Sequence, residues 1–83
     1  MKSGIYKILN KINGKFYIGS AVDLNYRWIL HKSRLNTGDH HNRNLQMSWN
    51  KYKQNSFEFS ILEYCELDKL LEREQRWIEQ TKF

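Results

Sequence analysis

The chain has 83 residues, of which 40% are hydrophobic and 14% aromatic, so it contains enough apolar side chains for one small core. Its single cysteine, Cys65, excludes an internal disulfide and a metal cluster built from cysteines. No apolar run is long enough for a signal peptide or a membrane span. We therefore expect one domain over residues 1–83, no membrane contact, and a cytoplasmic or nucleoid-associated location.

The charge of the chain favours a polyanionic partner. Fourteen Lys and Arg residues against nine Asp and Glu residues give a formal net charge of +5, and the sequence pI is about 9.5. The positive residues are spread over the whole length of the chain, which suits nucleic acid. Many soluble domains that do not bind nucleic acid carry a similar charge. More specific residues are therefore needed to decide whether this chain binds nucleic acid.

A β-hairpin is predicted at the start of the chain. The runs Gly4-Ile5-Tyr6 and Tyr17-Ile18-Gly19 flank Asn13-Gly14, a dipeptide that is typical of tight hairpin turns. A two-residue loop at this dipeptide pairs Asn10 with Tyr17 and Ile8 with Gly19. Because side chains alternate along a strand, one face of the hairpin then carries Gly4, Tyr6, Tyr17 and Gly19. A slip of one residue would separate Tyr6 from Tyr17.

Helices and a third strand are predicted after the hairpin. Ser20 and Asp23 are both suitable N-caps for a first helix that runs from Leu24 to about Leu35 and ends before Gly38. The later elements are a helix over about 42–53, a strand over 57–65 with one apolar face, and a last helix for which Asp68 is a candidate cap. That apolar strand face is expected to carry Phe57, Phe59 and Ile61. The order of elements predicts a small α+β domain with helices over a short sheet.

Three ionisable residues interrupt the apolar faces of these helices. Arg27 and His31 lie four residues apart on the face of the first helix that also carries Leu24, Trp28 and Leu35. Glu74 falls within the predicted buried stripe of the last helix, which consists of Leu67, Leu70, Leu71, Trp77 and Ile78. An uncompensated buried carboxylate costs several kcal/mol, so Glu74 needs a cation, a hydrogen-bond network or a cleft beside it.

Each of these residues also has a purely structural interpretation. Glu74 can form a partly buried ion pair with Arg27 or Arg73, and His31 can be a satisfied histidine at the edge of the core. Tyr6 and Tyr17 can be ordinary aromatic residues of a sheet face. Their coincidence favours a site, because together they supply a candidate base, a cation for an oxyanion and a metal-binding oxygen.

This combination suits phosphodiester hydrolysis, which requires a deprotonated water, neutralisation of charge at phosphorus and help for the leaving oxygen. Arg27 offers a planar, permanently charged fork for phosphate. A single carboxylate with water in the remaining positions is a usual way to hold Mg²⁺. The ordinary pKa of tyrosine is about 10, so a Tyr base requires a nearby cation that lowers its pKa, and Arg27 or the metal is available for this.

With these residues in view, the chain resembles the GIY-YIG nuclease family over essentially all 83 residues. Gly4-Ile5-Tyr6 and Tyr17-Ile18-Gly19 stand at the family's usual short separation, and Arg27, His31 and Glu74 follow in the family's order. The start of the chain and the segment 13–20 are most similar to the intron-encoded homing branch. The resemblance implies a three-stranded antiparallel sheet flanked by three helices, and divalent-metal-dependent cleavage of DNA.

The resemblance also implies roles for individual residues. Glu74 is expected to bind Mg²⁺ or Mn²⁺ and Arg27 to contact the scissile phosphate. Tyr6 is expected to act as general base or to orient the water, with Tyr17 as its positioning partner, and His31 to assist phosphate or leaving-group chemistry. The expected DNA-binding residues are His40, His41, Arg43 and Lys51. No zinc site is expected at the three histidines.

Several alternatives remain open from the sequence. The same scaffold can bind nucleic acid without efficient turnover, can be the nuclease part of a repair system, or can be a purely structural domain. It can also be the catalytic part of a longer protein with a separate DNA-binding region, and a transient dimer is one route to double-strand cleavage. Binding by this domain alone is expected to depend on phosphate contacts and to weaken with salt, by roughly 0.9 log units per log unit of salt for each phosphate neutralised.

Overall fold

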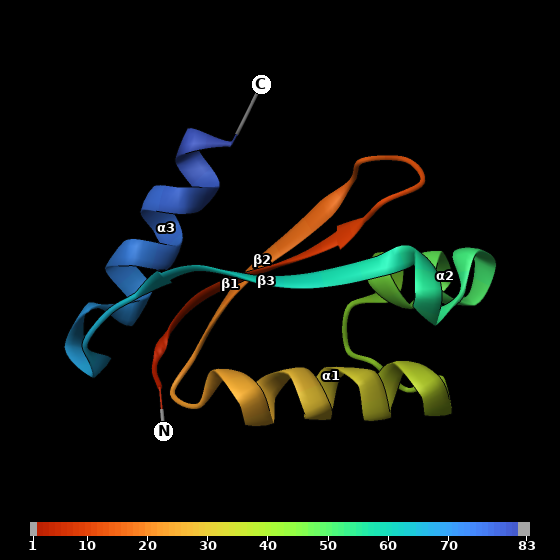
Figure 1. Ribbon diagram of the computed structural model, residues 1–83, viewed down its shortest axis with the longest axis horizontal. Coiled ribbons are helices and arrows are strands. Elements are labelled where there is room, and N and C mark those ends of the chain that lie inside the picture. Colours follow the sequence, from red (N-terminus) through yellow and green to blue (C-terminus); the bar gives the residue numbers. More distant parts are fainter. Residues whose placement is uncertain (1, 82–83) are drawn as a thin grey trace.

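Three strands form one antiparallel sheet in the computed structural model, which describes residues 2–81 (Figure 1). They are β1 (Gly4–Asn10), β2 (Phe16–Ala21) and β3 (Phe57–Tyr64), and β1 lies in the centre of the order β2-β1-β3. The helices are α1 (Leu24–Thr37), α2 (Arg43–Tyr52) and α3 (Leu70–Gln80), with short 3₁₀ turns η1 (Gln54–Ser56) and η2 (Leu67–Lys69). The predicted α+β class, with a three-stranded antiparallel sheet and three helices, is confirmed.

The register of the β1–β2 hairpin differs from the predicted register. Ile8 pairs with Tyr17 and Tyr6 pairs with Gly19, so the pairing is shifted by two residues from that of a two-residue loop. Side chains alternate between the two faces of a strand, and a shift of two residues therefore leaves each side chain on its original face. Tyr6 and Tyr17 consequently share a face of the sheet, as expected.

Side-chain hydrogen bonds in the hairpin loop explain the shift. The side-chain oxygen of Asn10 accepts from the backbone N–H of Ile12, and that of Asn13 accepts from the backbone N–H of Lys15, both at 2.9 Å. Each bond forms an Asx turn, in which an asparagine side chain replaces a backbone partner. Gly14 adopts φ +77°, which glycine does without steric cost. The loop therefore continues to Lys15, and β2 begins at Phe16. A two-residue turn would already have paired Lys15 with Ile12.

The hydrophobic core lies between the sheet and the first two helices. Figure 1 shows α1 and α2 on one side of the sheet and α3 on the other side. Trp28 of α1 stacks on Phe59 of β3 with ring centroids 4.9 Å apart and meets Trp49 of α2 edge-on at 6.4 Å. Each large side chain that is fully buried contributes about 1.5–3 kcal/mol relative to its exposed state. The buried core residues are Tyr6, Ile8, Ala21, Leu24, Leu35, Leu45, Trp49 and Phe57.

The ends of the first two helices follow from their capping residues. Of the two candidate caps of α1, Asp23 is the one used, and its side chain accepts from the backbone N–H of Tyr26 at 3.1 Å. Gly38 ends this helix with φ +83°, in the left-handed region. Asn42 caps α2 by accepting from the backbone N–H of Leu45 at 3.0 Å. These caps determine where the loop between the helices begins and ends.

The predictions for the last helix and the third strand were partly wrong. Asp68 lies within η2, and α3 starts after Lys69, which makes no capping side-chain bond. No residue of α3 is buried, and Leu71 is 80% exposed, because α3 packs against the narrow surface of β2 and β1. Ile61 is also exposed, beyond Phe59 on the expected apolar face of β3. Within residues 2–81, no helix is both long and apolar enough to cross a membrane.

Candidate active site

The predicted catalytic residues of the hairpin and of α1 meet on one face of the sheet. Tyr6 extends from the central strand and is only 1% exposed. Its ring centroid lies 6.3 Å from that of Tyr17 and 5.4 Å from that of His31. The rings of Tyr17 and His31 are 5.8 Å apart. The sheet and α1 thus bring three of the five predicted catalytic residues into mutual contact.

A close approach at Gly19 makes room for these rings. Gly19 pairs with Tyr6 across the hairpin, and a Cβ atom at Gly19 would lie 2.6 Å from Cζ of Tyr6 and 3.1 Å from Cε1 of Tyr17. The first separation is well below van der Waals contact, so any larger residue must displace the Tyr6 ring. This requirement gives the glycine of the second motif a packing role in the site.

Gly19→Ala is therefore expected to destabilise the protein by about 1–3 kcal/mol, the usual cost of an extra methyl in a packed interior. Urea denaturation followed by tryptophan fluorescence measures this change. Ser20→Ala, at the next position of the same strand, is the control and should change the free energy of unfolding much less. A Gly19→Ala protein as stable as the wild type would show that the Tyr6 ring can move without cost.

A chain of hydrogen bonds runs from the hydroxyl of Tyr6 to the start of α2. The Tyr6 oxygen lies 2.6 Å from Nε2 of His31, and Nδ1 of His31 lies 2.6 Å from Nε2 of His40. Nδ1 of His40 in turn accepts from the backbone N–H of Asn42 at 3.0 Å. Both imidazole rings are therefore bonded through both of their nitrogens.

His31 and His40, the two histidines in this series of hydrogen bonds, are neutral at pH 7. Burial is the main cause that lowers the pKa of His31 to about 4, followed by the neighbouring His40 and the positive charge of Arg27. The pKa of His40 is also below its ordinary value, mainly through burial and then through the adjacent His41. Neither ring is thus a cation that could bind phosphate by charge at neutral pH.

The protons in the chain can be assigned from its fixed end. The backbone N–H of Asn42 can only donate, so Nδ1 of His40 carries no proton and the neutral ring has its proton on Nε2. That proton is donated to Nδ1 of His31, which leaves the proton of neutral His31 on Nε2. His31 then donates to the oxygen of Tyr6. The Tyr6 hydroxyl is consequently an acceptor in this series of bonds, and its own proton points away from His31, on the side where Tyr17 is a hydrogen-bond partner.

A decrease in stability with falling pH is expected from His31. The pKa of histidine is about 6.5 in an unfolded chain and about 4 at His31 in the folded protein, so between these values the unfolded chain binds a proton that the folded chain does not. This difference lowers the free energy of unfolding by up to about 1.4 kcal/mol per pH unit as the pH falls.

Urea denaturation of wild type, His31→Gln and His41→Gln between about pH 7 and pH 4 measures this effect. The exposed His41 serves as the control, because its substitution keeps the buried chain intact. His31→Gln should show a weaker pH dependence than wild type and His41→Gln. An equal pH dependence in all three proteins would contradict the burial of a neutral His31.

The pKa of Tyr6 is higher than the ordinary value of tyrosine. Burial is the main cause, the neighbouring Tyr17 adds to it, and the positive charge of Arg27 offsets only part of the rise. Arg27 thus acts on the pKa of Tyr6 in the expected direction, but its effect is smaller than that of burial. The hydroxyl of Tyr6 is protonated at neutral pH, and a phenolate at this position requires positive charge beyond that of Arg27.

A cavity of about 220 Å³ opens over the histidine pair, and two arginines of α1 line it. Arg27 was predicted from the sequence, whereas Arg34 was missed. Arg34 follows Arg27 by seven residues and His31 by three, which places all three on one helix face, and this spacing is the signal that could have found it. Neither guanidinium forms an ion pair within residues 2–81, so both are available for an anion.

Gln46 is a second functional residue that the sequence analysis missed. It is buried on α2, accepts from the backbone N–H of His40 at 3.1 Å, and donates to the carbonyl of Leu35 and to the side chain of Asn50, both at 2.9 Å. These bonds hold the loop that carries His40 against the end of α1. A polar residue next to Leu45, on the apolar side of α2, was the signal in the sequence.

Glu74 lies half-buried on α3, close enough to Tyr6 for its negative charge to contribute to the raised pKa of the hydroxyl. Among residues 2–81, no hydrogen bond or ion pair involves its carboxylate. A half-buried carboxylate without a protein partner is suited to a cation from solution. Glu74 thus lies within electrostatic range of the Tyr6 hydroxyl.

Arg73, one of the two candidate ion-pair partners of Glu74, pairs with a different carboxylate in the structure. Arg73 forms a two-pronged pair with Glu63 of β3, with an Nη2–Oε1 distance of 2.7 Å and an Nε–Oε2 distance of 2.8 Å. The indole N–H of Trp77 donates to the same carboxylate at 3.1 Å. The interpretation of Glu74 as the partner of Arg73 or Arg27 is therefore wrong, because Glu63 already occupies Arg73 and Arg27 lies unpaired on α1.

The four predicted DNA-binding residues lie in different environments. His41 and Arg43 are exposed near the arginine-lined cavity and the start of α2. His40 is only 6% exposed, and both of its ring nitrogens are bonded inside the protein. Lys51 is exposed in the last turn of α2, about 12 Å along the helix from Arg43. The structure therefore groups His41 with Arg43 but not with Lys51, and their DNA contacts stay predictions.

Comparison with known proteins identifies close relatives. The model of the GIY-YIG catalytic domain matches residues 2–83. Intron-associated endonuclease 1 of Enterobacteria phage T4 is 49% identical over 82 residues, which cover 96% of this chain and 33% of that protein. The chain thus spans about a third of the length of this curated relative.

Two solved structures have the same fold with a TM-score of 0.88 each. One is the catalytic domain of the homing endonuclease I-TevI, with 47% identity over 95% of this chain and 87% of that chain. The other is a mutant of the catalytic domain of the intron endonuclease I-TevI, with 48% identity over 96% of this chain and 84% of that chain. At this level of identity and coverage, the similarity extends over sequence and fold together.

Proposed function

The chain belongs to the GIY-YIG catalytic domain family, and on this premise we propose that it is a divalent-metal-dependent endonuclease that hydrolyses DNA phosphodiester bonds. One observation carries the proposal. The carboxylate of Glu74 lies within electrostatic range of Tyr6, whose hydroxyl is bonded to His31 beside Arg27, and neither Glu74 nor Arg27 has an ion-pair partner within residues 2–81. This arrangement offers an oxygen ligand, an oriented hydroxyl and a phosphate-binding cation in one place.

Glu74 fits a hard divalent cation. Its carboxylate has no competing partner among residues 2–81, and a single protein carboxylate with water molecules is a usual site for Mg²⁺. We propose Mg²⁺ as the ion, with Mn²⁺ as a substitute. When bound, the ion supplies neutralisation of charge on the phosphate oxygens and acidification of a bound water.

Arg27 is proposed to bind the scissile phosphate. Its guanidinium lines the cavity over His31 and is free of carboxylates within residues 2–81. A guanidinium presents parallel N–H donors that match two phosphate oxygens. Arg34, two helical turns further along the same cavity, is proposed to bind a neighbouring phosphate of the same strand.

Tyr6 is proposed to orient the attacking water through its hydroxyl, with Tyr17 as its positioning partner. His31 holds the hydroxyl by donating to its oxygen, so the Tyr6 proton points away from the histidine chain. The raised pKa of Tyr6 favours this role over that of a base in the absence of further positive charge. The same donation from His31 would also stabilise a phenolate, so the chain supports Tyr6 in either protonation state.

Relaxation of supercoiled plasmid DNA at low salt tests the proposed activity. Wild-type protein is incubated with plasmid in Mg²⁺, in Mn²⁺ and in EDTA, and the fractions of supercoiled and nicked DNA are measured. We expect nicked circles with either metal and none with EDTA. A folded protein that binds the plasmid but leaves it supercoiled in both metals would instead support a binding module without turnover.

Two further partners are proposed on the same premise, a separate DNA-binding region and a second copy of the domain. A separate DNA-binding region in a longer protein, or a transient dimer, would allow recognition of a site and cleavage of both strands. Binding by this domain alone is proposed to rest on phosphate contacts, in keeping with its net charge of +5.

A further inference from the structure

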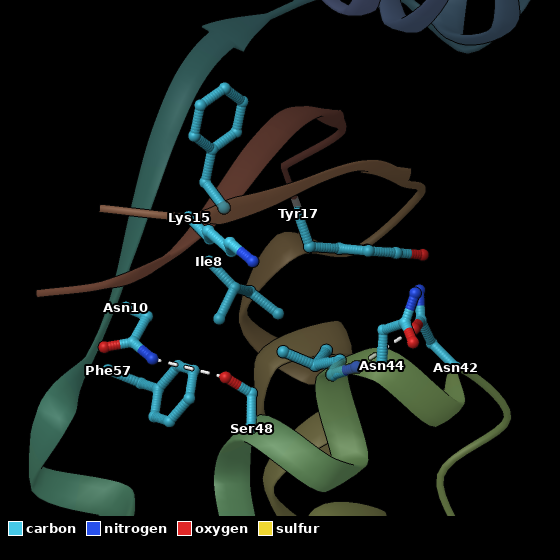
Figure 2. Close-up of a pocket in the computed structure, with 10 residues that line it drawn as sticks. Ile8, Asn10, Lys15, Tyr17, Asn42, Asn44, Ser48 and Phe57 are labelled. Atoms are coloured by element: carbon cyan, nitrogen blue, oxygen red, sulfur yellow. Dashed lines mark hydrogen bonds between the residues drawn. The ribbon is translucent and has the colours of Figure 1, made fainter. Parts of the chain in front are cut away.

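A second cavity, of about 290 Å³, lies beside the candidate active site and has no role in the proposed chemistry. It opens between the hairpin loop and the first turns of α2. Figure 2 shows Tyr17 and Asn42 at one end of this cavity and Asn10 and Phe57 at the other. Its size is close to the lower limit of small-molecule sites, which span about 300–1,000 Å³. We refer to it as the hairpin cavity.

The apolar surfaces of the hairpin cavity suit a flat ring. Ile8, Leu45 and Phe57 are buried core residues that form its base. Tyr17 adds aromatic surface from β2, whereas the ring of Phe16, the preceding residue, lies on the opposite face of the strand near Lys7. Aromatic side chains of this kind provide stacking surfaces for nucleobases. The partly exposed ring of Tyr17 is therefore the main aromatic surface that a ligand in the cavity can contact.

The polar groups of the cavity have unused hydrogen-bonding capacity. The side-chain oxygen of Asn42 accepts from Leu45, but its amide nitrogen has no partner among residues 2–81. Ser48 accepts from Asn10 at 3.2 Å, which leaves its hydroxyl proton free, and the exposed amide of Asn44 makes no bond within the described residues. Asparagine amides match the paired donor and acceptor at the edge of a base.

The charge at the cavity also favours a nucleotide. Lys15 is exposed and is the one charged residue among those that line the cavity, while no carboxylate lines it. A lysine at the mouth attracts a phosphate group while the amides and aromatic rings face the interior. The combination of one cation, amides and aromatic surfaces is typical of sites that bind nucleic acid.

The hairpin cavity adjoins the candidate active site through Tyr17 and Asn42. The Tyr17 ring that lines the cavity also lies 5.8 Å from the ring of His31. Asn42, whose side chain lines the cavity, also anchors the histidine chain through its backbone N–H. A ligand in the cavity would therefore contact two residues, Tyr17 and Asn42, that also contact the histidines of the candidate active site.

We propose that the hairpin cavity binds one nucleobase of the DNA next to the scissile phosphate and thereby sets a local sequence preference. This inference rests on the proposed nuclease function and names a specificity site for it. The nucleobase would be unstacked from its neighbours in the DNA and would lie against Tyr17 and the apolar floor of the cavity. Its edge would face Asn44 and Ser48. Lys15 would bind the phosphate of the same nucleotide.

Two variants and a matched control test the cavity in cleavage. Asn44→Ala removes a free amide, and Ser48→Leu fills the space beside Leu45. Asn25→Ala is the control, because Asn25 is also an exposed asparagine at the second position of a helix, α1, but does not line the cavity. Nick positions on a plasmid with a randomised segment are sequenced, and the base frequencies around each nick are compared.

We expect Asn44→Ala and Ser48→Leu to weaken the preference at one position beside the nick by at least about fivefold, the lower end of what one base contact supplies. Asn25→Ala should keep the wild-type preference. Equal base frequencies for wild type and both cavity variants would overturn the inference while leaving the nuclease function intact.

A binding measurement keeps the inference testable even if no cleavage is observed. The Glu74→Ala protein, labelled with ¹⁵N, is titrated without metal with a single-stranded trinucleotide and, separately, with inorganic phosphate. We expect the side-chain amide signals of Asn42 and Asn44 to shift with the trinucleotide but not with phosphate. Shifts confined to Arg27, Arg34 and His41 in both titrations would show phosphate binding alone and would overturn the base site.

Discussion

Glu74→Ala is expected to lower the rate of metal-dependent nicking by about 10³-fold or more without unfolding the protein. Loss of the metal ligand removes several kcal/mol of charge stabilisation, and each 1.36 kcal/mol corresponds to a factor of ten in rate. The carboxylate has no protein partner among residues 2–81, so its removal leaves no cation unpaired. The free energy of unfolding should therefore stay equal to that of wild type or rise slightly.

Plasmid nicking in Mg²⁺ and urea denaturation, measured on the same protein, check both parts of this prediction. Glu72→Ala is the matched control, since Glu72 is an exposed glutamate two residues earlier on the same helix. It should nick DNA at the wild-type rate. Retained nicking by Glu74→Ala would support a purely structural role for Glu74, and a large loss of stability would indicate an ion pair that the structure does not contain.

Arg27→Ala is expected to slow cleavage by about 10²–10³-fold, the usual cost of removing one donor to a developing oxyanion. Its effect on DNA binding should be only a few-fold, because Arg27 is one of several cations on the binding surface. The difference arises because the charge on the phosphate oxygens increases in the transition state, where the guanidinium is needed most.

Single-turnover nicking rates and dissociation constants for DNA, measured at one salt concentration, separate the two effects. Arg34→Ala is the control on the same helix face, and it should weaken binding by a similar amount while slowing cleavage less. Arg27→Lys should retain part of the binding but lose the two-point contact with phosphate. Equal losses of binding and rate in Arg27→Ala would count against a role for Arg27 in the transition state.

Features of the fold that depend on a few neighbouring residues could be predicted from the sequence. Asp23 and Gly38 delimit α1 through one cap and one left-handed residue, which need no contact with the rest of the chain. Strand alternation alone placed Tyr6 and Tyr17 on one face, and this held despite the wrong register. The spacing of Arg27 and His31 likewise predicted their common helix face.

Features that depend on competition between distant groups could not be predicted in this way. Helix periodicity placed Glu74 in a buried stripe, where Arg27 or Arg73 was its candidate partner, but Glu63 of β3 binds Arg73 and no ion pair within residues 2–81 involves Glu74. The periodicity of α3 predicted a buried stripe, yet the narrow sheet covers only part of it. The hydrophobic periodicity of a segment predicts which residues share a face. It does not predict how much protein surface packs against that face.

The sequence by itself thus determined the family, the order of the elements, and which side chains share a face of the hairpin and a face of α1. Only the tertiary structure decided the direction of the hydrogen bonds from Asn42 through the two histidines to Tyr6, and the sign of the change in the pKa of Tyr6. Hydrogen-bond direction and desolvation depend on which groups are enclosed together. That enclosure arises when β1, α1 and the loop before α2 pack, because these segments are far apart along the chain.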